Sequence, residues 1–338
     1  MRPLFPQLAE RVLKDGRVAL ITIVSTEGST PREMGARMIV TPKGEIAGSI
    51  GGGTLEYRLI HEAVTAMQKP EWSAEFRDVP LGPELGQCCG GRLTYIIEIY
   101  HVADSAALDA LAQRERQSAL LCEARLAGGA HLQRRVLDGV TQSETLNYDD
   151  GVMREMFRDT RSPILLFGAG HVGRALTLAL APLPFHTSWI DSREDAFPQF
   201  MPQNVTAIYS ADVESQIEAA PANAFILVMT HSHSLDLMIV NAALRRDDLP
   251  FVGLIGSATK RARFMRRLSD AGLGDAARQR LVSPIGLPSI TGKEPAVIAA
   301  SIVADLLIRR EVLLQSRCDT DAPLPLLSSI DFEDHPHE

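Results

Sequence analysis

The chain of 338 residues has only four cysteines and no long uninterrupted hydrophobic run. Four cysteines in a chain of this length do not make a disulfide framework. No stretch is long enough to cross a bilayer, which excludes a membrane-spanning protein and predicts no membrane partner. The first residues contain no apolar signal segment, so the sequence predicts a cytoplasmic protein.

Basic residues are also few: 34 Lys and Arg stand against 42 Asp and Glu, for a net charge of −8. Proteins that bind nucleic acid usually carry a basic excess, so we expect no nucleic-acid partner. The 45% of hydrophobic residues is close to the globular average and supplies enough apolar material for a core. The length suits two domains rather than one.

The first half of the sequence is rich in predicted strands. Pro42 and Gly44 form a turn signal between two apolar runs, which indicates a hairpin. The polar, pattern-poor segment 139–162 is typical of a linker, so we expect a strand-rich α+β domain over 1–138. The expected strands are 18–25, 35–41, 45–50, 92–100 and a second hairpin of 119–126 with 131–137, and the expected helices are 51–67 and 105–115.

The second half alternates apolar strands with helices from residue 163 to residue 315. This alternation predicts an α/β fold with a Rossmann-like, doubly wound parallel sheet. The polar and acidic tail, 316–338, is expected to be disordered. The expected strands are 163–170, 186–191, 205–210, 224–230 and 251–257, and the expected helices are 171–183, 212–219, 233–246, 258–271 and 294–314.

Gly168, Gly170 and Gly173 form a G-x-G-x-x-G pattern that follows an apolar strand and opens a helix at His171. In this context the first glycine permits a tight turn, the second lets a diphosphate approach the backbone, and the third lets helix and strand pack closely. The helix start offers free N–H groups to an anion. We therefore predict a site for a phosphate-bearing cofactor; the alternative is that the glycines serve turn geometry only.

Asp191 ends the next predicted strand, 18 residues after Gly173. Dinucleotide-binding enzymes place the acid that binds the ribose at this point. An acid that caps a helix in a loop would look the same in the sequence. Both interpretations remain open at this stage.

Other polar residues follow the later strands, at the edge where such sheets bind ligands. His231, Ser232 and His233 follow one strand and could supply hydrogen bonds and acid–base groups; Ser257 follows the next. Because the spacing of the histidines and Asp236 matches no common metal motif, we expect no metal there. The basic residues between 260 and 267 place cationic side chains near this edge, but a solvated helix face would have the same composition.

Two segments of the first half carry further chemistry. Cys88 and Cys89 are adjacent and precede two glycines. A thiol in such a loop can ionise, bind a soft metal or carry sulfur, whereas the alternative is a pair of small buried hydrophobic residues. Gly51, Gly52 and Gly53 open a predicted helix and form a second candidate anion site, or else a simple tight turn.

Several segments taken together resemble the XdhC/CoxI family, the accessory factors of xanthine dehydrogenases. They occur in the family's order and span most of the chain outside the acidic tail. The segments are GSTPRE at 28–33, GSIGGGTLE at 48–56, QCCGGR at 87–92, GAGHVG at 168–173, MTHSH at 229–233, GLIGS at 253–257 and the motif-rich stretch 283–307.

The resemblance implies an accessory protein that is not itself an enzyme. Such a protein would bind the molybdenum cofactor, molybdopterin, and protect it while a cysteine desulfurase-type partner supplies sulfide. It would then assist insertion into apo-xanthine dehydrogenase, and a homodimer is expected. The resemblance also implies that Arg32 and the glycine loops bind the cofactor and that Cys88 or Cys89, preferably Cys89, approaches the molybdenum.

Two alternatives remain open. An NAD(P)-dependent oxidoreductase is supported by the glycine pattern and by Asp191, although nothing in the first half resembles a substrate domain for hydride transfer. The other alternative is an assembly scaffold that has the nucleotide-binding fold but binds no ligand.

Overall fold

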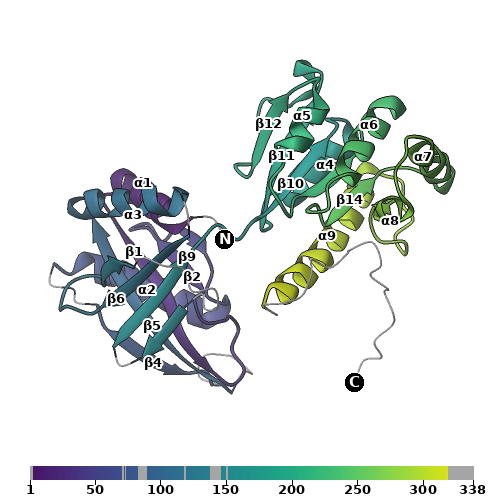
Figure 1. Cartoon of the computed structure of the whole chain (residues 1–338). Coiled ribbons are helices and arrows are strands. Elements are labelled where there is room, and N and C mark those ends of the chain that lie inside the picture. The colour runs from purple at the N-terminus through teal and green to yellow at the C-terminus, as the bar shows by residue number, and fades with distance from the viewer. Residues whose placement is uncertain are drawn as a thin grey trace. The chain divides into compact units, whose positions relative to one another are not determined.

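The computed structural model describes residues 3–70, 72, 74–82, 90–117, 119–137, 146–149 and 151–318. The chain divides into two compact units, Met1–Thr160 and Arg161–Glu338, hereafter unit 1 and unit 2 (Figure 1). None of the described helices is both long enough and apolar enough to cross a membrane.

Unit 1 contains two antiparallel sheets. The first has the strand order β3-β2-β1-β5-β4 and the second has the order β7-β6-β9-β8. Its strands are β1 (Arg17–Glu27), β2 (Arg37–Val40), β3 (Ile46–Gly48), β4 (Phe76–Pro80), β5 (Arg92–His101), β6 (Leu120–Arg125), β7 (Gln133–Val136), β8 (Leu146–Asp149) and β9 (Val152–Phe157). Its helices are α1 (Leu4–Asp15), α2 (Gly53–Gln68) and α3 (Ser105–Gln117), with a 3-10 turn η2 (Val102–Asp104).

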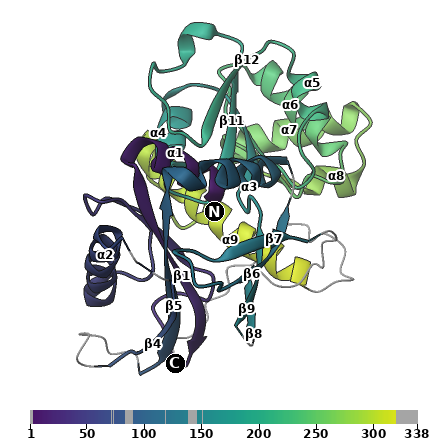
Figure 2. The same cartoon turned by 90° about the vertical axis from the view of Figure 1, so that its left-hand side faces the viewer.

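The central strand of unit 1, β1, is buried on both faces because each face is covered by another layer. Ile21 and Ile23 pack in the cluster that includes α2, whereas Val18 and Leu20 pack in the cluster that includes α1 and α3. Figure 2 shows α2 on one side of the first sheet and the second sheet on the other. Because each face of β1 packs against a different layer, its sequence is a continuous apolar run rather than an alternation of apolar and polar residues.

Both predicted hairpins are confirmed, since β2 pairs with β3 and β6 pairs with β7. The linker predicted at 139–162 is wrong where it covers β8 and β9, because β9 pairs with β6 along its whole length. The charged residues Arg154 and Glu155 interrupt the apolar pattern of this strand, so the sequence did not predict it. The segments of α1 and β4 were also not predicted as elements.

A network of buried charges joins the two sheets of unit 1. Arg134 on β7 donates to both oxygens of Glu98 on β5, at 2.8 Å each, and to Glu155 on β9 at 2.9 Å. Arg37 on β2 donates to the second oxygen of Glu155, also at 2.9 Å. Burial raises the pKa of Glu98, but the charge and hydrogen bonds of Arg134 outweigh it and hold that pKa below its ordinary value.

Unit 2 is a single parallel sheet with helices on both faces, as predicted. The strand order is β12-β11-β10-β13-β14-β15. Its strands are β10 (Ser162–Phe167), β11 (Phe185–Asp191), β12 (Val205–Tyr209), β13 (Phe225–Val228), β14 (Phe251–Leu254) and β15 (Leu281–Val282). Its helices are α4 (His171–Leu180), α5 (Val213–Glu218), α6 (His233–Leu244), α7 (Ala258–Asp270), α8 (Asp275–Gln279) and α9 (Pro295–Cys318), with a 3-10 turn η3 (Glu194–Ala196).

Two cores cover the two faces of this sheet. One core joins the strands to α5, α6 and α7, and the other joins them to α4 and α9 (Figure 1). The chain from β11 to β12 contains η3 in place of an α-helix, and α8 and β15 were not predicted. The first residues of the predicted tail, 316–318, end α9, and 319–338 lie outside the described residues.

We expect Arg134→Met to destabilise the protein by about 3–5 kcal/mol, because it leaves buried Glu98 without its cation and Glu155 with Arg37 alone. The matched control is Arg135→Met on the same strand, whose side chain is 73% exposed and pairs with Glu123. This change should cost no more than about 0.5 kcal/mol. Urea unfolding of both variants measures the difference; similar losses would show that the network does not stabilise unit 1.

Candidate functional site

The glycine turn after β10 contains two kinds of glycine. Gly168 has φ +111°, and a Cβ there would lie 2.3 Å from the carbonyl oxygen of Met229. A Cβ on Gly173 would lie 2.3 Å from the oxygen of Gly168, whereas a Cβ on Gly170 would meet nothing within 4 Å. The fold therefore requires the first and third glycines, while the second only keeps a space open.

The open space lies at the start of α4. Gly170 is the N-cap residue, and no described side chain caps this helix. His171, the first residue of α4, is exposed. The first N–H groups of a helix have no partner within the helix, and together with the helix dipole they favour an anion. The geometry therefore fits a phosphate group beside Gly170.

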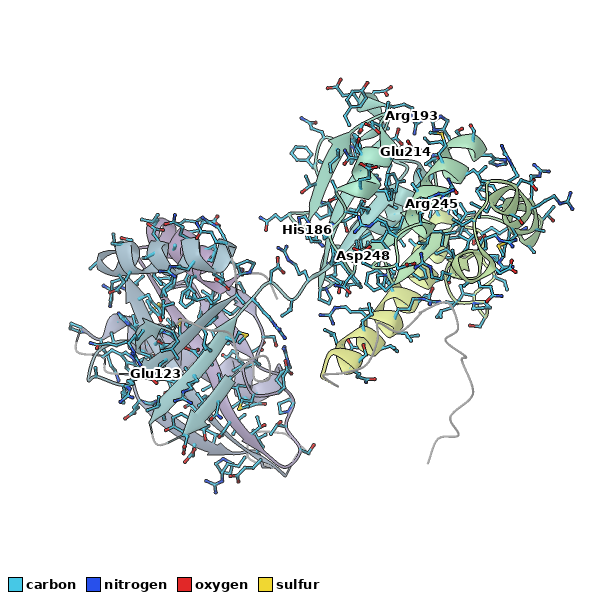
Figure 3. The ribbon with its side chains drawn as sticks, in the orientation of Figure 1. Glu123, His186, Arg193, Glu214, Arg245 and Asp248 are labelled. Atoms are coloured by element: carbon cyan, nitrogen blue, oxygen red, sulfur yellow. The ribbon has the colours of Figure 1, made fainter. Side chains whose placement is uncertain are left out.

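Asp191, at the end of β11, holds the same turn in place. Its carboxylate accepts hydrogen bonds from the N–H of Ala169, at 2.7 Å, and from the backbone and guanidinium of Arg193, at 2.9–3.0 Å. Figure 3 shows Arg193 at the surface of unit 2. Burial raises the pKa of Asp191, but these hydrogen bonds outweigh it and lower the pKa below its usual value. Both oxygens are thus engaged, and a ribose hydroxyl would have to replace Arg193.

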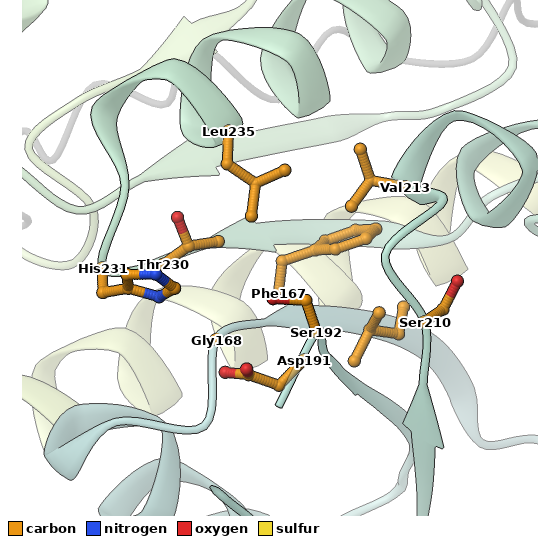
Figure 4. A pocket seen from close by; sticks show the side chains of 10 residues that line it. Phe167, Gly168, Asp191, Ser192, Ser210, Val213, Thr230, His231 and Leu235 are labelled. Carbon is orange, nitrogen blue, oxygen red and sulfur yellow. The ribbon is translucent and has the colours of Figure 1, made fainter. Parts of the chain in front are cut away.

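A hollow of about 250 Å³ lies over the carboxyl ends of β10, β11 and β13 (Figure 4). This is the edge where the strand order reverses, at which open α/β sheets bind ligands. The structure brings together here three of the predicted residues, Gly168, Asp191 and His231. Phe167, Ile190, Ser192, Ser210, Val213, Thr230 and Leu235 complete the lining.

The other predicted polar residues of this edge do not line the hollow. Ser232 caps α6 by accepting from the N–H of Leu235 at 3.4 Å, and Ser257 caps α7 by accepting from the N–H of Lys260 at 3.3 Å. His233 is exposed at the start of α6. Their part in cofactor binding stays a prediction, and their visible contacts are those of ordinary helix caps.

A buried ion pair behind this edge was not predicted. Asp236 is fully buried; one oxygen accepts from the N–H and hydroxyl of Thr230, at 3.0 and 2.7 Å. Its other oxygen accepts from Lys260 at 2.7 Å, and Lys260 also donates to the carbonyl of Ile255 at 2.9 Å. The pair fixes the loops after β13 and β14. Among the described residues there is no cluster of His, Cys, Asp and Glu that could hold a metal ion.

The second candidate anion site, in unit 1, is filled by a carboxylate of the chain itself. One oxygen of Glu56 accepts from the hydroxyl of Ser49 at 2.7 Å and from the N–H groups of Ile50 and Gly52, at 3.0 and 3.2 Å. An external anion at Gly51, Gly52 and Gly53 would have to displace this side chain. The geometry does not favour this part of the prediction.

Arg32 is similarly engaged. Its guanidinium donates to both oxygens of Glu33, at 2.9 and 2.8 Å, and to the carbonyl of Ser49 at 3.1 Å. Its predicted contact with a cofactor would require it to leave Glu33.

Segments of the family resemblance that are far apart in sequence meet at one end of the first sheet of unit 1. A Cβ on Gly91 would lie 2.4 Å from the oxygen of Ser29, and Arg32 contacts Ser49. The GSTPRE and glycine-rich loops therefore lie beside the start of β5. The predicted metal-contacting residues, Cys88 and Cys89, lie outside the described residues.

The sheet order, the glycine turn and the hollow at the switch point define a Rossmann-type domain, here in one chain with an α+β unit. Residues 164–306 match the family model described as the XdhC Rossmann domain, and residues 12–73 match the XdhC and CoxI family. The chain belongs to the XdhC and CoxI family.

Curated relatives are distant but extend along most of this chain. It is 25% identical over 310 residues to the Escherichia coli (strain K12) "Uncharacterized protein YqeB", covering 90% of this chain and 46% of that protein, so it spans about half the length of that relative. It is also 25% identical over 352 residues to a Bacillus subtilis (strain 168) protein named as a probable subunit of xanthine dehydrogenase, covering 91% of this chain and 98% of that protein.

One solved structure has a similar fold throughout. The crystal structure of a Bacillus halodurans protein titled a xanthine dehydrogenase superposes with a TM-score of 0.71, at 23% identity, and covers 96% of this chain and 99% of that chain. At this identity the likeness supports the fold alone.

We expect alanine substitutions to separate the three glycines by stability. Gly173→Ala should cost about 1–3 kcal/mol because its Cβ meets backbone, and Gly168→Ala more, since its φ also disfavours a side chain. Gly170→Ala should cost no more than about 1 kcal/mol, the range of a changed N-cap. Thermal and urea unfolding measure all three; a large loss in Gly170→Ala would show that the fold itself requires this glycine.

Proposed function

We propose that this protein binds the molybdenum cofactor, molybdopterin, protects it during sulfuration and assists its insertion into apo-xanthine dehydrogenase. The observation that carries the proposal is the open space beside Gly170, at an uncapped helix start. Molybdopterin carries a terminal phosphate, which suits such a site. The family assignment supports it, as does the relative whose name places it with xanthine dehydrogenase.

In this proposal the residues of unit 2 bind and orient the cofactor and carry out no reaction. The N–H groups at the start of α4 would donate to the phosphate, and the hollow bounded by Asp191, Thr230 and His231 would receive the adjoining part of the ligand. Lys260 and Asp236 keep the wall at Thr230 in place. When bound, the cofactor would supply the molybdenum centre at which sulfuration takes place. A cysteine desulfurase-type donor, a homodimer and a cytoplasmic location are parts of the same proposal.

The second candidate is an NAD(P)-dependent oxidoreductase, because Asp191 lies where such enzymes bind ribose. Against it, both oxygens of Asp191 accept protein hydrogen bonds. Mass spectrometry and metal analysis of the natively purified protein separate the candidates. Molybdenum with a pterin supports the first, nicotinamide the second, and an empty protein a scaffold.

Gly170→Val should leave the protein folded and block the phosphate. Its φ of −79° and ψ of −170° suit valine, and the added side chain would occupy the open space. Losing one or two charge-assisted hydrogen bonds should lower molybdenum retention at least about tenfold. The matched control is Gly274→Val, because Gly274 is also an N-cap glycine with φ −63° and nothing within 4 Å. Equal retention in both variants would place the phosphate elsewhere, for example at Gly51, Gly52 and Gly53.

Cys88→Ala with Cys89→Ala should weaken molybdenum retention and yield a poorly active xanthine dehydrogenase when the mutant matures it, because a thiolate is a soft ligand. Cys318→Ala is the control. Cys122 is a poorer one: burial raises the pKa of its thiol to about 12, and its place in the core means that alanine also costs stability. Equal molybdenum content in the double variant and the control would remove the thiols from the site.

A further inference from the structure

Strand β12 forms one edge of the unit 2 sheet and lacks the features that usually keep an edge strand from pairing with another chain (Figure 1). Its sequence, VTAIY, is rich in strand-forming residues and contains neither a charge nor a proline. The other described edge strands are protected, since β3 and β15 have only three and two residues, and β4, β7 and β8 contain charged residues. No charged residue stands between Asp195 and Asp212.

The main-chain groups on the free side of β12 have no partner in the part of the chain that the structure describes, apart from one N–H. Ser210 directs its N–H to β11, donating to Asp191 at 3.1 Å. Because successive residues of a strand direct their N–H and C=O groups to opposite sides, Val205, Ala207 and Tyr209 direct theirs away from β11. The N–H of Val205 donates to a carbonyl of the preceding turn at 3.0 Å. The N–H groups of Ala207 and Tyr209 and the carbonyls of all three residues are therefore available.

This pattern is complementary to itself. When two β12 strands run antiparallel about a two-fold axis at Ala207, each Ala207 donates to the carbonyl of the other. Two residues away, the N–H of Tyr209 meets the carbonyl of Val205 of the second copy, and the symmetric bond forms on the other side of the axis. The N–H of Val205, which is already used in its own chain, is the one group that this register leaves out.

Exposed aromatic side chains flank this edge on one face of the sheet. Val205 packs in the core that includes α4 and α9, so Tyr209, four residues later in the strand, lies on the same face and is 62% exposed. The loop before β12 also covers this face, because Phe197 packs on Trp189 with ring centroids 5.3 Å apart. Phe200, in the same loop, is 84% exposed.

The apolar area of these side chains is of the size that a dimer requires. Buried aromatic side chains cover about 150–250 Å² each, so those of two copies would supply on the order of half of the roughly 1,200 Å² in a small specific interface. The paired strands themselves supply further area.

We propose that two copies of this chain associate through their β12 edges, so that their parallel sheets form one continuous sheet. The proposal rests on the homodimer included in the proposed function, and not on the cofactor. Each chain has a net charge of −8, so an edge without charge is a place where two copies approach with little repulsion. Because the joined strands run antiparallel, the two hollows, each lined by Ser210, lie at opposite edges of the joined sheet and both stay open.

The test measures the mass of the full-length protein by size-exclusion chromatography with light scattering, over a range of micromolar concentrations. The wild-type protein should be a dimer. Ala207→Pro should raise the dissociation constant of the dimer at least about tenfold, because proline removes an N–H on the free side and leaves the bonds to β11 in place. Phe200→Lys with Tyr209→Lys should have the same effect through repulsion and lost apolar contact. Both side chains are exposed, so this second variant folds even if proline distorts the strand.

The matched control is Leu13→Lys with Tyr57→Lys, which gives the same charge change at two apolar residues of unit 1 that are 62% and 66% exposed. It should remain a dimer. Hydrogen–deuterium exchange of the peptide 205–209 should be slower in the dimer than in either edge variant. A monomeric wild-type protein, edge variants that dimerise as well as the control, or exchange at 205–209 that is independent of dimerisation would each overturn the proposal.

Molybdenum and pterin content, measured on the same samples, separates this proposal from the cofactor. A dimer without molybdenum or pterin contradicts the proposed function and leaves the β12 interface in place. A monomer that retains both contradicts the interface and leaves cofactor binding in place.

Discussion

The close approach of the β10 turn to the end of β13 is the constraint on which the site depends. Gly168 lies so near the carbonyl of Met229 that no side chain fits, and Gly173 lies equally near Gly168. This approach aims the start of α4 at the ligand edge, and it places Ala169 where its N–H reaches Asp191. The two elements also pair directly, since the N–H of Met229 donates to Phe167.

The parallel sheet of unit 2 could be predicted from the sequence because its strands are buried on both faces and read as short apolar runs between helices. Strand β9 could not, since Arg154 and Glu155 interrupt its apolar pattern. Glu155 is tolerated inside because Arg37 and Arg134, distant in sequence, neutralise it. A strand that contains charged residues has the sequence pattern of a loop, and only the structure identifies the partners that neutralise those charges.

The candidate site could likewise be predicted from the sequence only where its residues form a local motif. The glycine pattern and Asp191 could be found because the turn is local and its spacing is characteristic. The pair of Asp236 and Lys260 could not, because its members are 24 residues apart and meet only when β13 and β14 are neighbours. The loop at Gly51, Gly52 and Gly53 has the composition of an anion site. Only the structure shows that Glu56, from the following helix, already supplies the anion.

The buried charges of unit 2 are placed where they fix loops of the chain. Interior charges such as Asp236 and Asp305 are paired with cations, which fixes the loops without leaving an unpaired charge to strengthen ligand binding. No lysine or arginine is among the described residues that line the hollow, so under the proposed function a phosphate would depend on the backbone N–H groups at the start of α4.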